Sequence, residues 1–91
     1  MSQISGQITI VTAGVVVRGP DISGGVFILK ALTTNSGVAY FGNDGNGTVS
    51  SLTGIPLAAG ESLPVNVSNL STLYFNSTAG SEKIAWVKFD V

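Results

Sequence analysis

The sequence predicts an all-β protein, a small antiparallel β-sandwich or barrel of about seven short strands. Apolar and polar residues alternate along short segments with the period of two that is typical of a strand. No segment carries the i, i+3, i+4, i+7 apolar stripe of an amphipathic helix. Turn-forming clusters of glycine, asparagine, proline and serine separate the segments about every 8–12 residues, as in sandwiches.

Each expected strand is bounded by such clusters, and the set is Gly6–Arg18, Val26–Thr33, Val38–Phe41, Thr48–Leu52, Leu63–Val67, Leu70–Asn76 and Glu82–Val91. Gly14 predicts a bulge inside the first strand, and Gly19-Pro20 ends that strand because proline cannot continue a ladder. We expect Asp21–Gly25 to be a loop and Thr34–Gly37 to be a turn. Residues 6–91 are expected to form one β domain, and residues 1–5 a flexible N-terminal arm.

The segment Gly42–Gly47, which reads GNDGNG, predicts a hairpin turn between Val38–Phe41 and Thr48–Leu52. Glycine adopts positive φ there at little cost. The segment lacks the Lys-Ser/Thr pair and the following helix of a phosphate loop. Asp44 is its only acid, whereas calcium needs several oxygen ligands including carboxylates. We therefore expect a turn there, followed by a loop over Thr53–Glu61.

The later strands differ in their apolar pattern. Leu63–Val67 alternates apolar with polar residues, and Pro64 predicts that it is an edge strand. By contrast, Val26–Thr33 is nearly all apolar except for Lys30, which is typical of a strand covered on both faces.

The last strand has two distinct faces. One face is entirely apolar and is expected to join the core, and it consists of Ala85, Val87, Phe89 and Val91. The opposite face consists of Ile84, Trp86, Lys88 and Asp90. Tryptophan is enriched at protein interfaces. Two interpretations stay open: Trp86 contacts another protein, or it packs beneath a loop of its own chain.

The charge content excludes several partners. Charged residues make up 10% of the chain, against roughly 25% in an ordinary soluble domain, and the net charge is −1. The chain therefore offers neither the clustered Lys and Arg of a nucleic-acid surface nor a polybasic membrane patch. No apolar run approaches the about 20 residues of a spanning helix. The N-terminal segment lacks the features of a signal peptide, so we expect synthesis in the cytoplasm.

The residue types present also argue against an enzymatic function. The chain has no cysteine and no histidine, which excludes a Cys/His zinc site and a histidine general base. The five acids are scattered along the chain, and we expect them to be solvated at the surface: Asp21, Asp44, Glu61, Glu82 and Asp90. The expectation is a protein with no catalytic residues, no bound metal and no cofactor, hence not an enzyme.

The small size favours self-association. A chain of 91 residues buries only about 60–65% of its unfolded surface, so its stability starts near the margin. A small apolar domain without disulfides often buries further surface against copies of itself. We expect a homo-oligomer, with a trimer preferred over a dimer.

Aromatic and aliphatic side chains supply the candidate contacts. Tyr40-Phe41 and Tyr74-Phe75 each place one ring on either face of a strand. Outward rings would suit a carbohydrate platform, although exposed aromatics more often mark protein contacts. The candidate interface residues are Ile84, Trp86, Tyr40, Tyr74, Ile55 and Leu57.

Several stretches between residues 26 and 75 resemble a pattern of small β-rich virion proteins of tailed bacteriophages: Phe27-Ile28-Leu29-Lys30-Ala31-Leu32, Asn35-Ser36-Gly37-Val38-Ala39-Tyr40-Phe41-Gly42, Gly54-Ile55-Pro56-Leu57, Ala59-Gly60-Glu61-Ser62 and Asn69-Leu70-Ser71-Thr72-Leu73-Tyr74. That group comprises capsid decoration or cement proteins and small tail-associated proteins. The resemblance implies an all-β homo-oligomer on a protein shell, without catalytic residues. Residues 1–25 and 76–91 carry no matching motif.

Together these observations predict a non-enzymatic virion structural protein on the capsid surface. It would bind the outside of an assembled phage capsid, with the major capsid protein as its partner, and stabilise the capsomer junctions as a cement protein does. Binding only the assembled lattice stabilises that lattice by mass action. The alternative is a tail- or fibre-associated binding module that recognises carbohydrate or a host surface.

Overall fold

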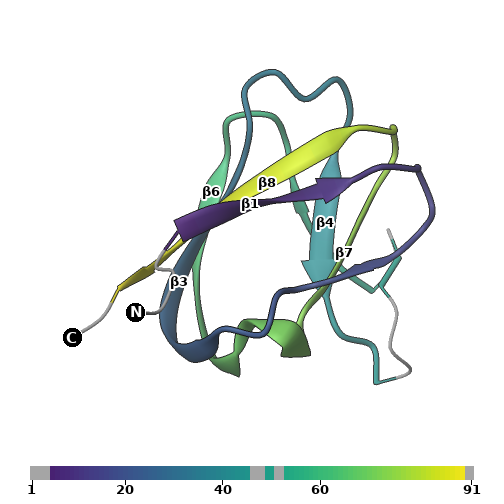
Figure 1. Ribbon diagram of the computed structural model, residues 1–91. Coiled ribbons are helices and arrows are strands. Elements are labelled where there is room, and N and C mark those ends of the chain that lie inside the picture. The colour runs from purple at the N-terminus through teal and green to yellow at the C-terminus, as the bar shows by residue number, and fades with distance from the viewer. Residues whose placement is uncertain (1–4, 46–48, 51–52, 90–91) are drawn as a thin grey trace.

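The computed structural model describes residues 5–45, 49–50 and 53–89, which form two antiparallel sheets packed face to face (Figure 1). The first sheet has the strand order β1-β8-β3-β6. Its strands are β1 (Ser5–Ile10), β8 (Glu82–Phe89), β3 (Ser23–Ala31) and β6 (Ser62–Asn69). The second sheet has the order β2-β7-β4-β5. Its strands are β2 (Val17–Arg18), β7 (Tyr74–Ser77), β4 (Ala39–Gly42) and β5 (Ile55–Leu57).

The chain changes sheet at nearly every connection, and only β4 and β5 are both consecutive and paired. Two four-stranded antiparallel sheets with this interleaved order make a jelly roll, the double Greek-key form of the β-sandwich. The predicted all-β sandwich class is confirmed.

The prediction of one continuous strand over Gly6–Arg18 is wrong. β1 ends at Ile10, residues 11–16 turn the chain, and β2 begins in the other sheet. Gly14 has φ +80°, a left-handed conformation that suits a turn, and its N–H donates to the Ser77 carbonyl at 3.3 Å. What the sequence presented as a bulge is the corner at which the chain crosses between sheets.

Other boundaries move as well. β3 begins at Ser23, within the expected loop Asp21–Gly25. The expected return strand Thr48–Leu52 lies largely outside the described residues, and Val49 and Ser50 belong to no strand. β4 pairs instead with β5, which occupies part of the expected loop Thr53–Glu61.

The segment Leu70–Asn76 starts as a short 3₁₀ helix, Leu70–Thr72, before β7 begins. The Asn69 side chain caps this helix, because its Oδ1 accepts a hydrogen bond from the Ser71 N–H at 2.9 Å. β6 matches its prediction: exposed and half-buried residues alternate, and Pro64 lies on an edge strand. The proposed flexible arm falls on residues 1–4, outside the described residues, and on Ser5, which starts β1.

The core lies between the two sheets and centres on aromatic rings. Phe27 on β3 meets Trp86 on β8 edge-on, with ring centroids 6.0 Å apart and planes at 68°. Phe41 and Phe75, on adjacent strands of the second sheet, have ring centroids 6.3 Å apart. All four rings are buried and belong to one cluster that spans both sheets.

Glu82, at the start of β8, is buried and fastens the loop between β3 and β4. Its Oε1 accepts hydrogen bonds from the Ser36 N–H at 3.0 Å and the Ser36 hydroxyl at 3.1 Å. Its Oε2 accepts one from the Gly37 N–H at 3.1 Å. The expectation that every acid is solvated is therefore wrong for Glu82, whose burial is compensated by charge-assisted hydrogen bonds.

We expect Glu82→Gln to lower the free energy of unfolding by about 1.5–3 kcal/mol, because the amide nitrogen would turn a donor toward the loop donors. Glu61→Gln is the matched control. Glu61 is exposed and accepts one hydrogen bond, from the Ala58 N–H at 2.7 Å, so its loss should stay below about 1 kcal/mol. Urea unfolding measures both, and equal losses would contradict the role given to Glu82.

Candidate docking face

The outer face of the first sheet, turned away from the second sheet, carries aliphatic side chains at its centre. On β3 the inward residues Phe27, Leu29 and Ala31 are buried, and the residues between them point outward. The outward aliphatic residues of the central strands are all half-buried: Val26 and Ile28 on β3, and Ala85 and Val87 on β8. In an antiparallel sandwich this outer face is commonly polar.

Strand register joins these residues into a continuous surface. Ile28 lies opposite Val87 of β8 on one side and opposite Pro64 of β6 on the other. Val87, Ile28 and Pro64 therefore form an apolar row across three adjacent strands. Val26 and Ala85 extend this row on either side. We call the five residues Val26, Ile28, Pro64, Ala85 and Val87 the docking face.

Polar and cationic residues surround the docking face. Ser5, Gln7 and Thr9 occupy the outward positions of β1, and Ser62, Asn66 and Ser68 those of β6. Lys30 and Lys83 are exposed on β3 and β8. An apolar centre with a polar rim is the arrangement of a protein–protein interface.

Four of the six predicted interface residues are buried within this chain. Ile84 is 0% exposed, Trp86 4%, Tyr40 8% and Leu57 3%, so they offer almost no surface to a partner. Ile55 on β5 is 50% exposed and Tyr74 is half-buried, and both stay candidates for contact.

The faces of β8 are the reverse of the expectation. Ile84 and Trp86 point into the core, whereas Ala85 and Val87 point outward. The side chain of Phe89, and residues 90–91, lie outside the described residues. Trp86 is the larger group and fills the space beside Phe27, which favours this choice of inward face. Apolar residues on both faces left the sequence pattern ambiguous.

The outer face of the second sheet is partly covered by its own chain. Tyr40 and Asn76 lie opposite each other there, on β4 and β7, and both are buried. The connection between β4 and β5 folds over them, because Asn76 Nδ2 donates to the Val49 carbonyl at 3.1 Å and Val49 is buried. The GNDGNG segment starts this connection, with Gly45 at φ +91° donating to Asn43 Oδ1 at 2.8 Å. Residues 46–47 of it lie outside the described residues.

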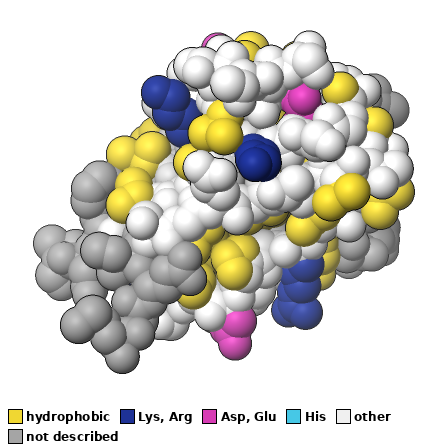
Figure 2. Space-filling model, turned by 45° about the horizontal axis from the view of Figure 1, so that its top comes forward, with side chains coloured by type: hydrophobic (Ala, Val, Ile, Leu, Met, Phe, Trp, Pro, Cys, Tyr) yellow, Lys and Arg dark blue, Asp and Glu magenta, His cyan; other side chains and the backbone are white. Residues whose placement is uncertain are grey.

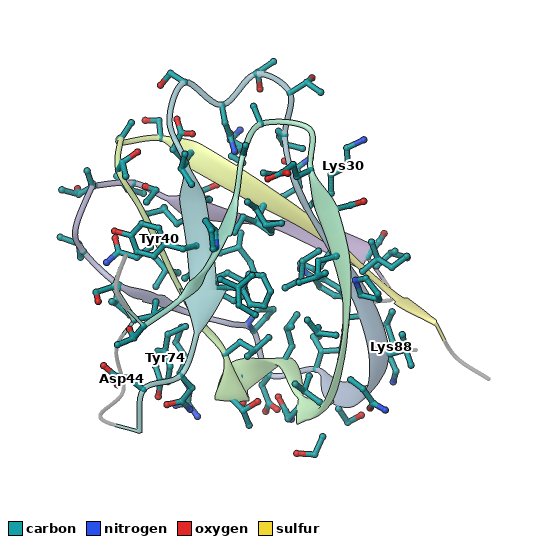
Figure 3. All side chains as sticks on the ribbon, turned by 180° about the vertical axis from the view of Figure 1, so that it is seen from behind. Lys30, Tyr40, Asp44, Tyr74 and Lys88 are labelled. Carbon is teal, nitrogen blue, oxygen red and sulfur yellow. The ribbon has the colours of Figure 1, made fainter. Side chains whose placement is uncertain are left out.

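The two sides of the molecule thus differ (Figure 3). Tyr40, Tyr74 and Asp44 lie on the side of the second sheet, and Lys30 and Lys88 lie on the side of the first. A flat aromatic platform for sugars needs exposed rings. Of the outward rings of the two aromatic pairs, Tyr40 is buried and Tyr74 is partly exposed.

Isolated aliphatic side chains are exposed elsewhere on the described surface, and two edge strands carry proline. Val11 and Val15, in the turn between β1 and β2, are 69% and 56% exposed. The edge strands β5 and β6 contain Pro56 and Pro64, and proline on an edge hinders pairing with another chain. Figure 2 shows hydrophobic side chains reaching the surface in several groups, with few charged side chains between them.

A shallow polar hollow lies beside the 3₁₀ helix. Arg18, Gly19, Asp21 and Ser71 line it. Arg18 Nε donates to the Ser71 carbonyl at 3.1 Å, and Asp21 Oδ1 accepts from Asn69 Nδ2 at 2.8 Å. These contacts hold the loop after β2 against the helix, so the Arg18 and Asp21 side chains have a structural role.

The described residues hold neither a metal-binding cluster nor a membrane-spanning helix. No group of three or more His, Cys, Asp or Glu in them lies close enough together to hold a metal ion. No helix among them is long and apolar enough to cross a membrane.

The strand order and the docking face define the class: a jelly-roll sandwich with an apolar outer face on one sheet. No family model and no curated protein matches the chain. Among solved structures, the chain is similar to a protein of Bacillus endospore appendages, described as a novel family of disulfide-linked pili. The two share 19% sequence identity over 96% of this chain and 85% of that chain, with a TM-score of 0.51. This likeness shows the fold, and the present chain has no cysteine.

Substitutions at two neighbouring residues of β3 test which of its faces points into the core. We expect Leu29→Thr to lower the free energy of unfolding by about 3 kcal/mol or more, because Leu29 is 0% exposed and its replacement leaves a cavity and a buried hydroxyl. Ile28→Thr should cost about 1 kcal/mol or less, since threonine keeps the strand propensity on a half-exposed face. Thermal and urea unfolding measure the stability of both variants. A larger loss of stability for Ile28→Thr than for Leu29→Thr would mean that the faces are assigned wrongly.

Proposed function

We propose that this chain is a non-enzymatic structural subunit that docks onto a larger protein assembly through the docking face. The observation that carries the proposal is the apolar row Val87–Ile28–Pro64 across three strands of the first sheet. The second sheet covers only the inner side of these strands, and the described chain places no element over the outer side. Covering such a row removes apolar surface from water, which stabilises the contact by about 25 cal/mol per Å² of apolar surface buried.

The finer form of the proposal is a capsid decoration or cement protein. The resemblance of residues 26–75 to small phage virion proteins supports it, as does the low charge of the chain. The jelly roll also occurs in viral capsid domains, although the fold alone does not identify a function. The docking face would lie on the major capsid protein, and the chain would stabilise capsomer junctions because it binds only the assembled shell.

A second candidate is the subunit of a fibre or appendage formed by copies of this chain. The fold likeness to the endospore appendage protein favours it. Val11 and Val15 lie near the β2 edge of the second sheet, and Ile55 lies on the opposite edge strand β5. Different apolar groups at opposite edges suit head-to-tail contacts, which propagate as a ring or a filament.

The non-enzymatic part of the proposal rests on the side chains present. The chain has no histidine or cysteine to serve as a base or nucleophile. Glu82, the buried carboxylate of the described chain, accepts hydrogen bonds from Ser36 and Gly37 and holds a loop.

Particles purified from the source of the chain test the proposed function. We expect antibodies against the chain to label the outer surface of capsids, and capsids from a deletion strain to break at a lower temperature because the junctions lose contacts. Ile28→Asp in the full chain should reduce the copies retained on each particle at least tenfold, whereas Thr9→Asp, on β1 at the rim, should change retention little.

Label on fibres rather than capsids would replace the first candidate with the second. A chain absent from every particle and fibre would overturn the proposed structural role altogether.

A further inference from the structure

The charges around the docking face are all of one sign among the described residues. Lys30 on β3 and Lys83 on β8 are both exposed and both occupy outward positions. Lys30 lies opposite Ala85, two residues from Lys83, so the two lysines are diagonal neighbours on adjacent strands. Their ammonium groups repel each other in the free chain and would be stabilised by an anionic partner.

The acids of the described chain lie elsewhere. Glu82 points inward to the loop at Ser36 and Gly37. The Glu61 carboxylate turns back to the Ala58 N–H before β6 begins. Asp21 binds Asn69 beside the 3₁₀ helix, and Asp44 belongs to the connection after β4, on the side of the second sheet.

We propose that the docking face binds an acidic protein surface with an apolar centre, an inference that rests on the proposed function and names the chemistry of its partner. The aliphatic row buries against apolar side chains, and carboxylates at the rim pair with Lys30 and Lys83. Complementary charge at a rim guides association and excludes wrong partners.

Other occupants fit less well. A second copy on this face would offer Lys30 and Lys83 no carboxylate, because the acids of the described chain lie away from the docking face. Nucleic acid requires a larger cluster of Lys and Arg than two lysines around an aliphatic row.

Nuclear magnetic resonance of the full chain with a designed probe tests the inference. The probe is an amphipathic helical peptide of about 18 residues, with a leucine stripe flanked by glutamates, because a helix packs naturally on a sheet face. We expect its addition to shift the backbone amides of β3 and β8 around Ile28 and Val87. The shifts should shrink in 0.5 M salt, where the screening length falls to about 4–5 Å.

Matched controls isolate the contribution of the charges to binding. The same peptide with every glutamate replaced by lysine should bind the chain about tenfold more weakly or worse. The original peptide should lose affinity by the same factor for the double variant Lys30→Glu and Lys83→Glu. The Lys30→Arg and Lys83→Arg double variant should keep the affinity. Unchanged thermal unfolding of both variants shows that they remain folded.

Several results would overturn the inference: equal affinity for both peptides, shifts confined to the second sheet, or amide shifts of this face that grow with protein concentration alone, which would identify a second copy. Lysine-dependent binding to phosphatidylglycerol vesicles without peptide binding would identify a lipid surface instead. A chain found on particles but indifferent to the acidic peptide would refute the inference and leave the proposed structural role intact.

Discussion

The central strands β3 and β8 are apolar on both faces, and a sandwich of two sheets can cover only one of them. Phe27, Leu29 and Trp86 occupy the inner side and meet the second sheet, where Phe41 and Phe75 complete the core. This packing places the outward aliphatic residues of the same two strands where the described chain supplies no cover. The fold therefore creates its docking face as a direct consequence of how it builds its core.

Polar contacts between residues far apart in sequence hold the strand crossings in place. Glu82 fastens the β3–β4 loop at Ser36 and Gly37, and Asn35 forms two hydrogen bonds with the backbone of Lys83. A jelly roll needs such anchors because its chain crosses from sheet to sheet and few consecutive strands pair. These polar groups thus serve the topology.

The functional proposals follow from an asymmetry between the two sheets. The second sheet partly covers its outer face with the β4–β5 connection, where Val49 and Tyr40 are buried. The first sheet presents aliphatic side chains and two lysines outward. A low-charge jelly roll with one such face suits a subunit of a larger assembly. The two candidates differ in the contact they use: capsid decoration would cover the docking face with another protein, whereas a fibre would join copies through Val11, Val15 and Ile55 at the edges of the second sheet.

The sequence by itself determined the all-β class, the edge position of β6 through Pro64, and the double-sided apolar pattern of Val26–Leu29, because these depend on local geometry and composition. Only the tertiary structure decided which side of β8 enters the core. Ile84 and Trp86 alternate with Ala85 and Val87, so period-two reasoning fits both orientations equally, and the larger volume of Trp86 beside Phe27 resolves the choice. The corner at Gly14 and the anchoring of Glu82 likewise depend on partners distant in sequence, which no local pattern encodes.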